Sequence, residues 1–310
     1  MKRLLIAILT VSMLCGCTLQ TAEVQTDHWA MDTYMNFKFW GADAGEATEQ
    51  IKALLSDLEE TWSAADENSF LSRLNRGEAA PTAEQQELLD RALALSQRAN
   101  GAFDPRLNSA ISLWGFLSDD YRVPDKAELS EALQQKQWNL GAAIKGYAGQ
   151  QAAELLSELK IDRAILNLGG NVQTYGEKEN GSLWQIAIQN PTGGDYIGVV
   201  SVTGTMSVVT SGDYQRYFEQ DGVRYHHILD PKTGGPADSG LASVTVICRD
   251  GMTADALSTA LFVMGLERGT EFWRQSDDFE AVFILTTGEI YATEGAALSG
   301  CEYEVISREK

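Results

Sequence analysis

The sequence has few basic residues for its length. Its 310 residues contain 24 Lys and Arg against 44 Asp and Glu, a formal net charge of −20 at pH 7. A nucleic acid needs a basic surface on its partner, so this balance argues against nucleic-acid binding. A phosphate-bearing ligand is still compatible with it if a cation and backbone N–H groups neutralise the phosphate locally. Hydrophobic residues make up 44% and charged residues 22%, which argues against global disorder.

Long apolar runs are missing beyond the first residues. Lys2-Arg3 precedes an apolar stretch at 4–14 that is too short to span a bilayer and is typical of a signal peptide. Residues 14–17, Leu-Cys-Gly-Cys, resemble a bacterial lipobox. We therefore expect a lipoprotein signal peptide at 1–16, a lipid on Cys17, and an extracytoplasmic protein that is lipid-anchored to a bacterial membrane. An ordinary cleaved signal peptide is the alternative.

Cysteine is scarce as well. If Cys15 leaves with the signal peptide and Cys17 carries lipid, Cys248 and Cys301 remain. Two cysteines are too few for a disulfide framework or a structural zinc site. They could pair in an oxidising compartment, or each could be a small buried apolar residue, and the sequence leaves both open.

Hydrophobic periodicity predicts helices and strands that come in runs instead of strict alternation. This order favours an α+β fold over a doubly wound sheet. Thr82 and Gln85 form a capping-box pattern before a helix that ends at Asn100-Gly101. Other helices are expected at 51–62, 125–137, 145–160, 253–264 and 267–275, and strands at 33–40, 164–168, 184–188, 197–202, 207–210, 224–228, 242–247, 280–285 and 289–292. We find no repeat or interdomain linker and expect a short polar tether at 17–28 and one domain at 29–310.

Polar side chains are concentrated in residues 206–259. On the expected helix, Asp255, Ser258 and Thr259 are spaced i, i+3 and i+4, so a carboxylate and two hydroxyls share one face. Oxygen donors of this kind suit Mg²⁺ or Ca²⁺. The alternative is an acidic first turn that favours the helix dipole, with hydroxyls bonded back to the backbone. Spacing alone favours the alternative.

A second polar motif contains two of the three histidines, His226 and His227, followed by Asp230. Adjacent strand residues face opposite ways, so at most one of these histidines points into a given site. A histidine beside a carboxylate can act as a general base near neutral pH. A structural His–Asp pair that holds the turn at Pro231 explains the pattern equally well.

Three glycine-bearing segments are each weak indications of a ligand. Residues 141–147 combine close backbone approach with the cation of Lys145, as an anion site needs. Residues 101–105 and 168–171 are explained as well by simple turns. None of the three matches a Walker A loop or a dinucleotide-binding fingerprint.

Eight short motifs nevertheless follow one another across the chain in a set order: Met31-Asp32-Thr33; Ser69 with 72–75; 101–105 with 113–116; 140–147; 167–171; 210–217; 226–234; and 254–260. Together they resemble the ApbE family of FAD:protein FMN transferases. The resemblance implies a single α+β domain of the ApbE type, with a mixed or antiparallel sheet and packed helices. It also changes the weighing of the Asp255 cluster, which becomes a predicted Mg²⁺ site.

The implied activity is the Mg²⁺-dependent transfer of FMN from FAD to a Ser or Thr hydroxyl of another protein, with release of AMP. His227 would act as the base and Asp230 would orient it. The resemblance implies a metal site and a substrate site on named residues. Mg²⁺ would be bound by Ala142 (through its carbonyl), Asp255, Ser258 and Thr259, and FAD would contact Met31, Ala102, Phe103, Asp104, Asn139, Lys145 and Leu229.

The chain departs from the family pattern at three places. The family often has Asp where this chain has Asn139 and Gln150, and an aromatic residue expected shortly before Ser69 is absent, with Ala65 near its place. Asn139 keeps hydrogen bonding but loses charge. Without the aromatic residue, the chain would lack one flavin-stacking contact that the resemblance implies.

The partner implied by the resemblance is an acceptor protein, either a subunit of a redox-driven membrane complex or an extracytoplasmic flavoprotein. Two other functions use the same residues. With water as the acceptor, the site would be an FAD pyrophosphatase that releases FMN and AMP. Without catalysis, the chain would be a flavin-binding lipoprotein.

Overall fold

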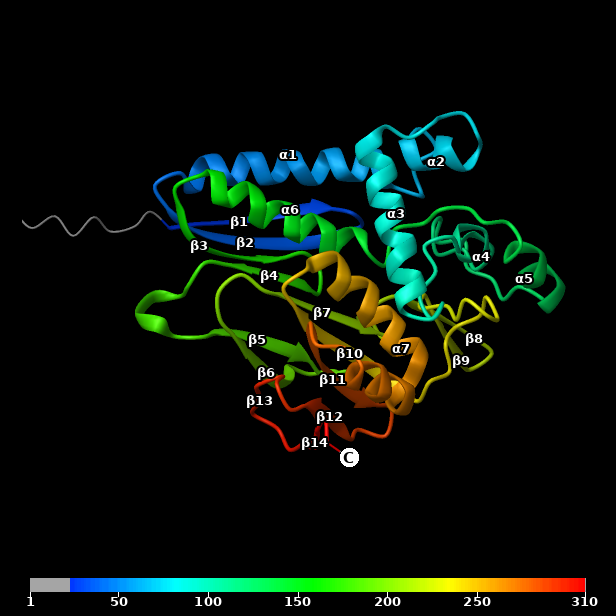
Figure 1. The fold of residues 1–310 in the computed structure, drawn as a ribbon. Coiled ribbons are helices and arrows are strands. Elements are labelled where there is room, and N and C mark those ends of the chain that lie inside the picture. The colour runs from blue at the N-terminus through cyan, green and yellow to red at the C-terminus, as the bar shows by residue number, and fades with distance from the viewer. Residues whose placement is uncertain (1–22, 310) are drawn as a thin grey trace, which may run out of the picture.

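The computed structural model describes residues 23–309, and a nine-stranded sheet forms the centre of the fold (Figure 1). The predicted signal peptide and Cys17 lie outside the described residues. Neighbouring strands are antiparallel except for the parallel pair β12–β14. In spatial order the strands are β1 (Glu23–Ala30), β2 (Thr33–Gly41), β3 (Ile161–Asn167), β4 (Asn171–Tyr175), β7 (Ser207–Gly212), β10 (Leu241–Cys248), β11 (Phe279–Leu285), β12 (Ile290–Thr293) and β14 (Glu304–Ile306). The predicted α+β class with a mixed, mostly antiparallel sheet is confirmed.

Three helices cover one face of this sheet: α1 (Ala44–Trp62), α6 (Ile144–Glu158) and α7 (Gly251–Arg274) (Figure 1). Each has a buried apolar side with helical spacing. In α1 the buried residues include Ile51 and Leu55, which belong to the same core cluster as Phe37 and Phe39 of β2. None of the helices described between residues 23 and 309 combines the length and the apolar character that a membrane span requires.

A smaller antiparallel sheet covers part of the opposite face. It consists of β5 (Trp184–Gln189), β6 (Tyr196–Val202) and β13 (Leu298–Ser299). Alternate residues of β5, beginning with Trp184, are buried, and the residues between them are exposed. The buried side chains join a core cluster with Val208 of β7 and Ile247 of β10. The fold is therefore a layer of helices, a large sheet and a small sheet.

The remaining elements gather mainly at one end of the large sheet (Figure 1). They are α2 (Phe70–Asn75), α3 (Ala83–Arg98), α4 (Asn108–Leu113), α5 (Lys126–Ala132) and the hairpin β8 (Tyr217–Gln220) and β9 (Val223–His226), while a short 3₁₀ turn, η1 (Glu179–Gly181), lies between β4 and β5. The predicted capping box of α3 is confirmed: Thr82 Oγ1 accepts from the Gln85 N–H at 3.3 Å, and Gln85 Oε1 accepts from the Thr82 N–H at 3.0 Å.

Some predicted boundaries were wrong. The tether expected at 17–28 overlaps β1, because residues 23–28 pair with β2; their polar outer face hides the strand in the sequence. The two helices predicted at 253–264 and 267–275 are confirmed: both carry the label α7, and the non-helical φ of 77° at Gly265 separates them. The strand predicted at 224–228 ends at His226, so His227 lies just beyond it. The short helices α2 and α4 were not predicted.

Cys248 and Cys301 are both free thiols, so the disulfide that the sequence left open is not formed. Cys248 is buried in the main core cluster, and this burial raises the pKa of its thiol to about 11. At neutral pH it is a small buried apolar residue rather than a nucleophile.

Candidate active site

Asp255 lies where α6 and α7 meet backbone to backbone. Each helix contributes a glycine to the contact: a Cβ on Gly146 would lie 2.0 Å from the carbonyl oxygen of Gly251 and 2.6 Å from the Cβ of Asp255. Any side chain at Gly146 would therefore push the helices apart. The close approach allows the Gly146 N–H to donate to Asp255 Oδ2 at 2.8 Å. The carboxylate is thereby fixed at the start of α6.

A carbonyl group just before α6 is also unengaged. Helix α6 begins after its N-cap Ala143, so the Gly146 N–H is one of the first-turn donors that have no acceptor within the helix. It donates to Asp255, and the Ala142 carbonyl, which lies outside the helix, accepts no hydrogen bond within residues 23–309. The Asp255 carboxylate thus meets the first turn of α6, and the unengaged carbonyl lies in the turn directly before that helix.

The two hydroxyls of α7 differ in what they contact. Helix α7 holds Asp255, Ser258 and Thr259 at the predicted spacing. Ser258 is fully buried; its Oγ donates to the Asp255 carbonyl at 2.8 Å and pairs with Ser211 Oγ of β7 at 2.7 Å. Thr259 is partly exposed, and its Oγ1 lies 3.3 Å from Ser211 Oγ. Thr259 can therefore serve a ligand, whereas Ser258 is engaged in fastening α7 to β7.

The surroundings of Asp255 have opposing effects on the pKa of its carboxyl group. Burial raises the pKa of this carboxyl group, and Lys145 and the Gly146 N–H oppose that rise. The buried side chain of Asn171, which acts on Asp255 through a hydrogen bond, opposes the rise as well.

His227 is oriented by a backbone carbonyl. Its N–H and its Nδ1 both lie 3.0 Å from the carbonyl oxygen of Arg216. A carbonyl only accepts, so Nδ1 carries the proton and Nε2 holds the lone pair. Burial is the main cause that lowers the pKa of His227 to about 4, with Lys145 contributing, so the imidazole is neutral at pH 7. Since Lys145 acts on both Asp255 and His227, all three share one region.

The predicted pair between His227 and Asp230 is not formed. Asp230 Oδ1 accepts the Lys232 N–H at 2.9 Å, and the Asp230 N–H donates to the Gly235 carbonyl at 2.8 Å. The carboxylate closes its own turn, which is the usual behaviour of Asp in a turn. The orienting role predicted for Asp230 falls to the Arg216 carbonyl.

His226 faces the other way, as strand alternation predicted. It is buried, its Nε2 lies 3.2 Å from the Ala237 carbonyl, and its ring meets Phe262 edge-on at 5.5 Å between centroids. Burial lowers its pKa. His226 is therefore a core residue, and only His227 is available to a ligand.

Met31 lies in the two-residue turn between β1 and β2. Met31 and Asp32 both have positive φ, 52° and 55°, the conformation that a tight hairpin turn requires. The Met31 N–H donates to Glu59 Oε1 of α1 at 2.9 Å. Sequence reasoning missed Glu59 because 28 residues separate it from the turn, and only the packing of α1 on β1 brings them together.

Residues 102–104, which the resemblance to the family places at the FAD site, have buried or paired side chains. The side chains of Ala102 and Phe103 are buried, so a ligand would meet this segment mainly through its backbone. Asp104 is paired with Arg106 at 3.1 Å and with Lys136 at 3.3 Å. Its acceptor oxygens are already neutralised by two cations.

The turn that leads into α6 is held by amides. Asn139 Oδ1 accepts the Gly141 N–H at 2.9 Å, and Asn139 Nδ2 donates to Asn108 Oδ1 at 3.2 Å. Both ends of the Asn139 amide are thus hydrogen-bonded within the chain. Gln150 accepts from Arg91 at 3.1 Å, and Arg91 also pairs with Asp250, the N-cap of α7.

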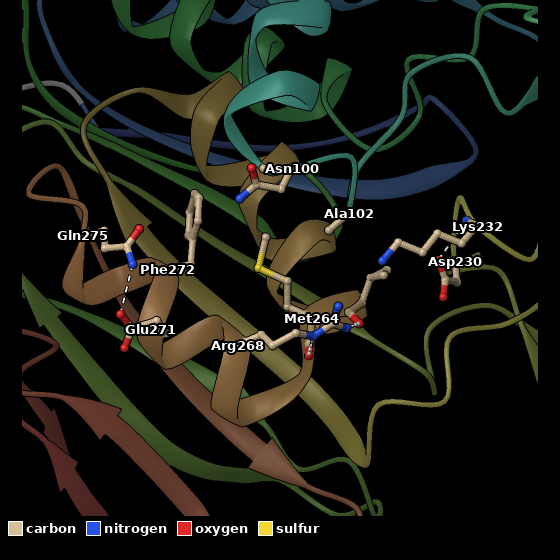
Figure 2. A pocket seen from close by; sticks show the side chains of 11 residues that line it. Asn100, Ala102, Asp230, Lys232, Met264, Arg268, Glu271, Phe272 and Gln275 are labelled. Carbon is tan, nitrogen blue, oxygen red and sulfur yellow. Dashed lines mark hydrogen bonds between the residues drawn. The ribbon is translucent and has the colours of Figure 1, made fainter.

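A pocket of about 300 Å³ lies beside residues 102 and 230. Figure 2 shows Met264 and Phe272 on one side of it and Asp230 and Lys232 on the other. Of the predicted site residues, Ala102 and Asp230 line this pocket, whereas Asp255, His227 and Lys145 do not. Leu229, next to Asp230, is buried, and its backbone pairs with that of Pro236 in an isolated antiparallel β-bridge. The pocket therefore takes in two of the predicted residues and does not contain the polar group formed by Asp255, Lys145 and His227.

The donor set fits a hard divalent cation such as Mg²⁺. Asp255, Thr259 and the Ala142 carbonyl supply oxygen donors only, and Mg²⁺ completes its shell with water or phosphate oxygens. One carboxylate leaves such an ion with excess positive charge. Within residues 23–309, no group of three or more His, Cys, Asp or Glu residues suited to a metal occurs.

Comparison with known proteins gives a consistent result. The family model described as "ApbE family" matches residues 31–283. The FAD:protein FMN transferase of Treponema pallidum is 33% identical, over 82% of this chain and 81% of that protein. The enzyme of the same name from Haemophilus influenzae is 31% identical, over 96% and 97%. A crystal structure of the ApbE protein of Thermotoga maritima superimposes with a TM-score of 0.82 at 31% identity, covering 88% of this chain and 97% of that one.

Proposed function

The chain belongs to the ApbE family of enzymes, and we propose that it transfers FMN from FAD to a Ser or Thr hydroxyl of another protein, with Mg²⁺. The observation that supports this most directly is the convergence of three features. These are the Asp255 carboxylate with the free Ala142 carbonyl, the cation of Lys145, and the lone pair on His227 Nε2. A diphosphate ester and an attacking hydroxyl need each of them.

The covalent step balances as a displacement at phosphorus. The acceptor oxygen forms a bond to the FMN phosphorus, and the bond from that phosphorus to the bridging oxygen breaks. AMP leaves with the bridging oxygen, and the hydroxyl proton passes to His227 Nε2. Little covalent work is left for the protein, whose contribution is positioning and charge stabilisation.

The residues of this chain act on the proton and on the charge. A pKa of about 4 keeps His227 unprotonated at pH 7, and the Arg216 carbonyl directs its lone pair. Lys145 lowers that pKa, so a diphosphate placed beside Lys145 would offset its charge and raise the basicity of His227. Binding of the substrate would thereby strengthen the base.

Asp255, Thr259 and the Ala142 carbonyl would hold Mg²⁺. When bound, the ion would neutralise negative charge on the diphosphate. Ser258 would support this site indirectly, through its bonds to the Asp255 carbonyl and Ser211.

One experiment separates the three functions. The mature chain is incubated with FAD, Mg²⁺ and a candidate acceptor protein, and the products are followed by flavin fluorescence in a denaturing gel, the mass of the acceptor, and AMP release. We expect a labelled acceptor and an equal amount of AMP. AMP without label would make the chain a pyrophosphatase, and bound FAD without turnover would make it a binding protein.

We also propose that Cys17 carries a lipid that anchors the protein at the extracytoplasmic side of a bacterial membrane. The support is the lipobox-like sequence at 14–17. Membrane fractionation of the wild type and of Cys17→Ala tests this. Equal recovery of both proteins in the soluble fraction would contradict the anchor.

A further inference from the structure

We infer that Arg216 is a positioning residue, whose side chain holds the loop that orients His227. The inference rests on the proposed function, because it assigns the means by which the proposed base is kept in its working tautomer. The loop concerned runs from the end of β7 at Gly212 to the start of β8 at Tyr217.

The backbone of Arg216 makes the contact that orients the histidine. Its carbonyl accepts from the N–H of His227 and from Nδ1 of the same residue, each at 3.0 Å. These bonds extend the β8–β9 hairpin by one residue pair beyond Tyr217 and His226. A shift of the carbonyl would release the ring, which could then place its proton on either nitrogen.

The side chain of Arg216 ties this loop to two other segments. One guanidinium nitrogen lies 3.4 Å from Asp119 Oδ1, and the other lies 4.0 Å from Asp32 Oδ2. Both aspartates lie in left-handed turns, with φ 58° and 55°. Asp119 also accepts from the Tyr121 hydroxyl at 2.7 Å. Arg216 thus connects the β1–β2 turn, the loop at Asp119 and the histidine.

The ion pairs of Arg216 are too weak to stabilise the whole fold, but they can hold the loop in place. Arg216 is partly exposed and both aspartates are largely exposed, so solvent screens the pairs and they add little to global stability. The other attachments of the loop lie before Arg216: the Asp213 N–H donates to the Ala242 carbonyl of β10 at 3.1 Å, Gln215 Nε2 donates to the Thr210 carbonyl at 3.1 Å, and the Gln215 N–H lies 3.5 Å from the Gly212 carbonyl. A side chain that contributes little to the fold can still decide where its own carbonyl lies.

The Met31 turn is held independently of Arg216. The Glu59 carboxylate accepts the Met31 N–H at 2.9 Å from the other side. Loss of Arg216 should therefore impair the base more than the binding of FAD. The two roles can therefore be told apart: a positioning residue affects mainly kcat, whereas a residue in direct contact with the substrate would raise the KM for FAD when it is removed.

The test compares Arg216→Ala and Arg216→Lys with the control Arg224→Ala. Arg224 lies in the same hairpin and pairs with Glu219 at 3.5 Å and with the ring of Tyr217, away from His227. In the flavin-transfer assay we expect Arg216→Ala to lower kcat about ten-fold, a part of what a general base contributes, with a KM for FAD within about two-fold of wild type. Arg216→Lys should recover part of kcat, and Arg224→Ala should match the wild type.

Imidazole ¹⁵N NMR gives a readout that does not depend on activity. The chain has only three histidines, so the signals of His227 can be assigned with a His227→Gln variant. The wild type should show one tautomer, protonated at Nδ1, and Arg216→Ala a mixture of the two. A single unchanged tautomer together with an unchanged kcat would overturn the inference, and so would a raised KM with an unchanged kcat. Failure of the proposed function would instead appear as no labelled acceptor with the wild type.

Discussion

The contact between Gly146 and Gly251 offers the sharpest test of how the site is built. Gly146→Ala adds one methyl group where the nearest atom, the Gly251 carbonyl oxygen, would lie 2.0 Å away. An ordinary contact needs about 3.4 Å, and the obstacle is backbone, so α6 and α7 must separate by about 1 Å or more. That movement would break the hydrogen bond from the Gly146 N–H to Asp255.

The cost can be estimated from two contributions. Overpacking of a tight core contact costs about 1–3 kcal/mol, and the loss of a buried hydrogen bond to a charged group adds about 1.5 kcal/mol. We expect Gly146→Ala to lower the free energy of unfolding by about 2.5–4.5 kcal/mol. With an unfolding entropy of about 2.1 cal/mol/K per residue, this corresponds for a chain of this size to a fall in Tm of roughly 4–7 °C.

The assay is thermal and urea unfolding, followed by flavin transfer below the lowered Tm. The matched control is Gly45→Ala in α1, where an added Cβ meets no atom within 4 Å. A glycine-to-alanine change inside an unobstructed helix should be neutral or stabilise by up to about 1 kcal/mol. If Gly146→Ala unfolds like the control and transfers flavin at the wild-type rate, the proposed geometry of the metal site is wrong.

Three other perturbations address single groups. Burial raises the pKa of the Asp255 carboxyl above its value in the unfolded chain, so the ionised carboxylate lowers the stability of the fold as pH rises through this range. Asp255→Asn should therefore have a Tm at or above that of the wild type at pH 7–8 in chelator, yet have no transferase activity. A lower Tm of the variant in chelator would contradict this. The His227 imidazole has a pKa of about 4 and must be unprotonated to act as a base. The kcat/KM of the free enzyme should therefore be flat from pH 6 to 8 and fall below about pH 5. A fall already between pH 7 and 6 would argue against a pKa of about 4. Glu59→Ala should raise the KM for FAD about three- to ten-fold, because the Met31 turn loses one charge-assisted hydrogen bond. Glu59→Gln keeps an acceptor and should have a KM close to that of the wild type. Equal KM values for both variants would show that Glu59 does not have this role.

Local patterns predicted the local structure well. The capping box at Thr82 and Gln85, the alternation that turns His226 and His227 to opposite sides, and the helical spacing of Asp255 and Thr259 all have the expected geometry. Each depends on residues within one or two turns of the chain, whose conformational preferences act without the rest of the fold. Strand β1 escaped prediction because its exposed edge needs no apolar pattern.

From the sequence alone, the order of the motifs determined the family, and the order of helices and strands determined the α+β class. Only the tertiary structure decided how these residues are paired. It gave His227 the carbonyl of Arg216 instead of the carboxylate of Asp230, and it brought the Asp255 carboxylate of α7 to the Gly146 N–H in the first turn of α6. Such contacts join backbone groups, which every residue carries alike, so residue identity holds no record of them. They follow from where two elements cross, which long-range packing alone determines.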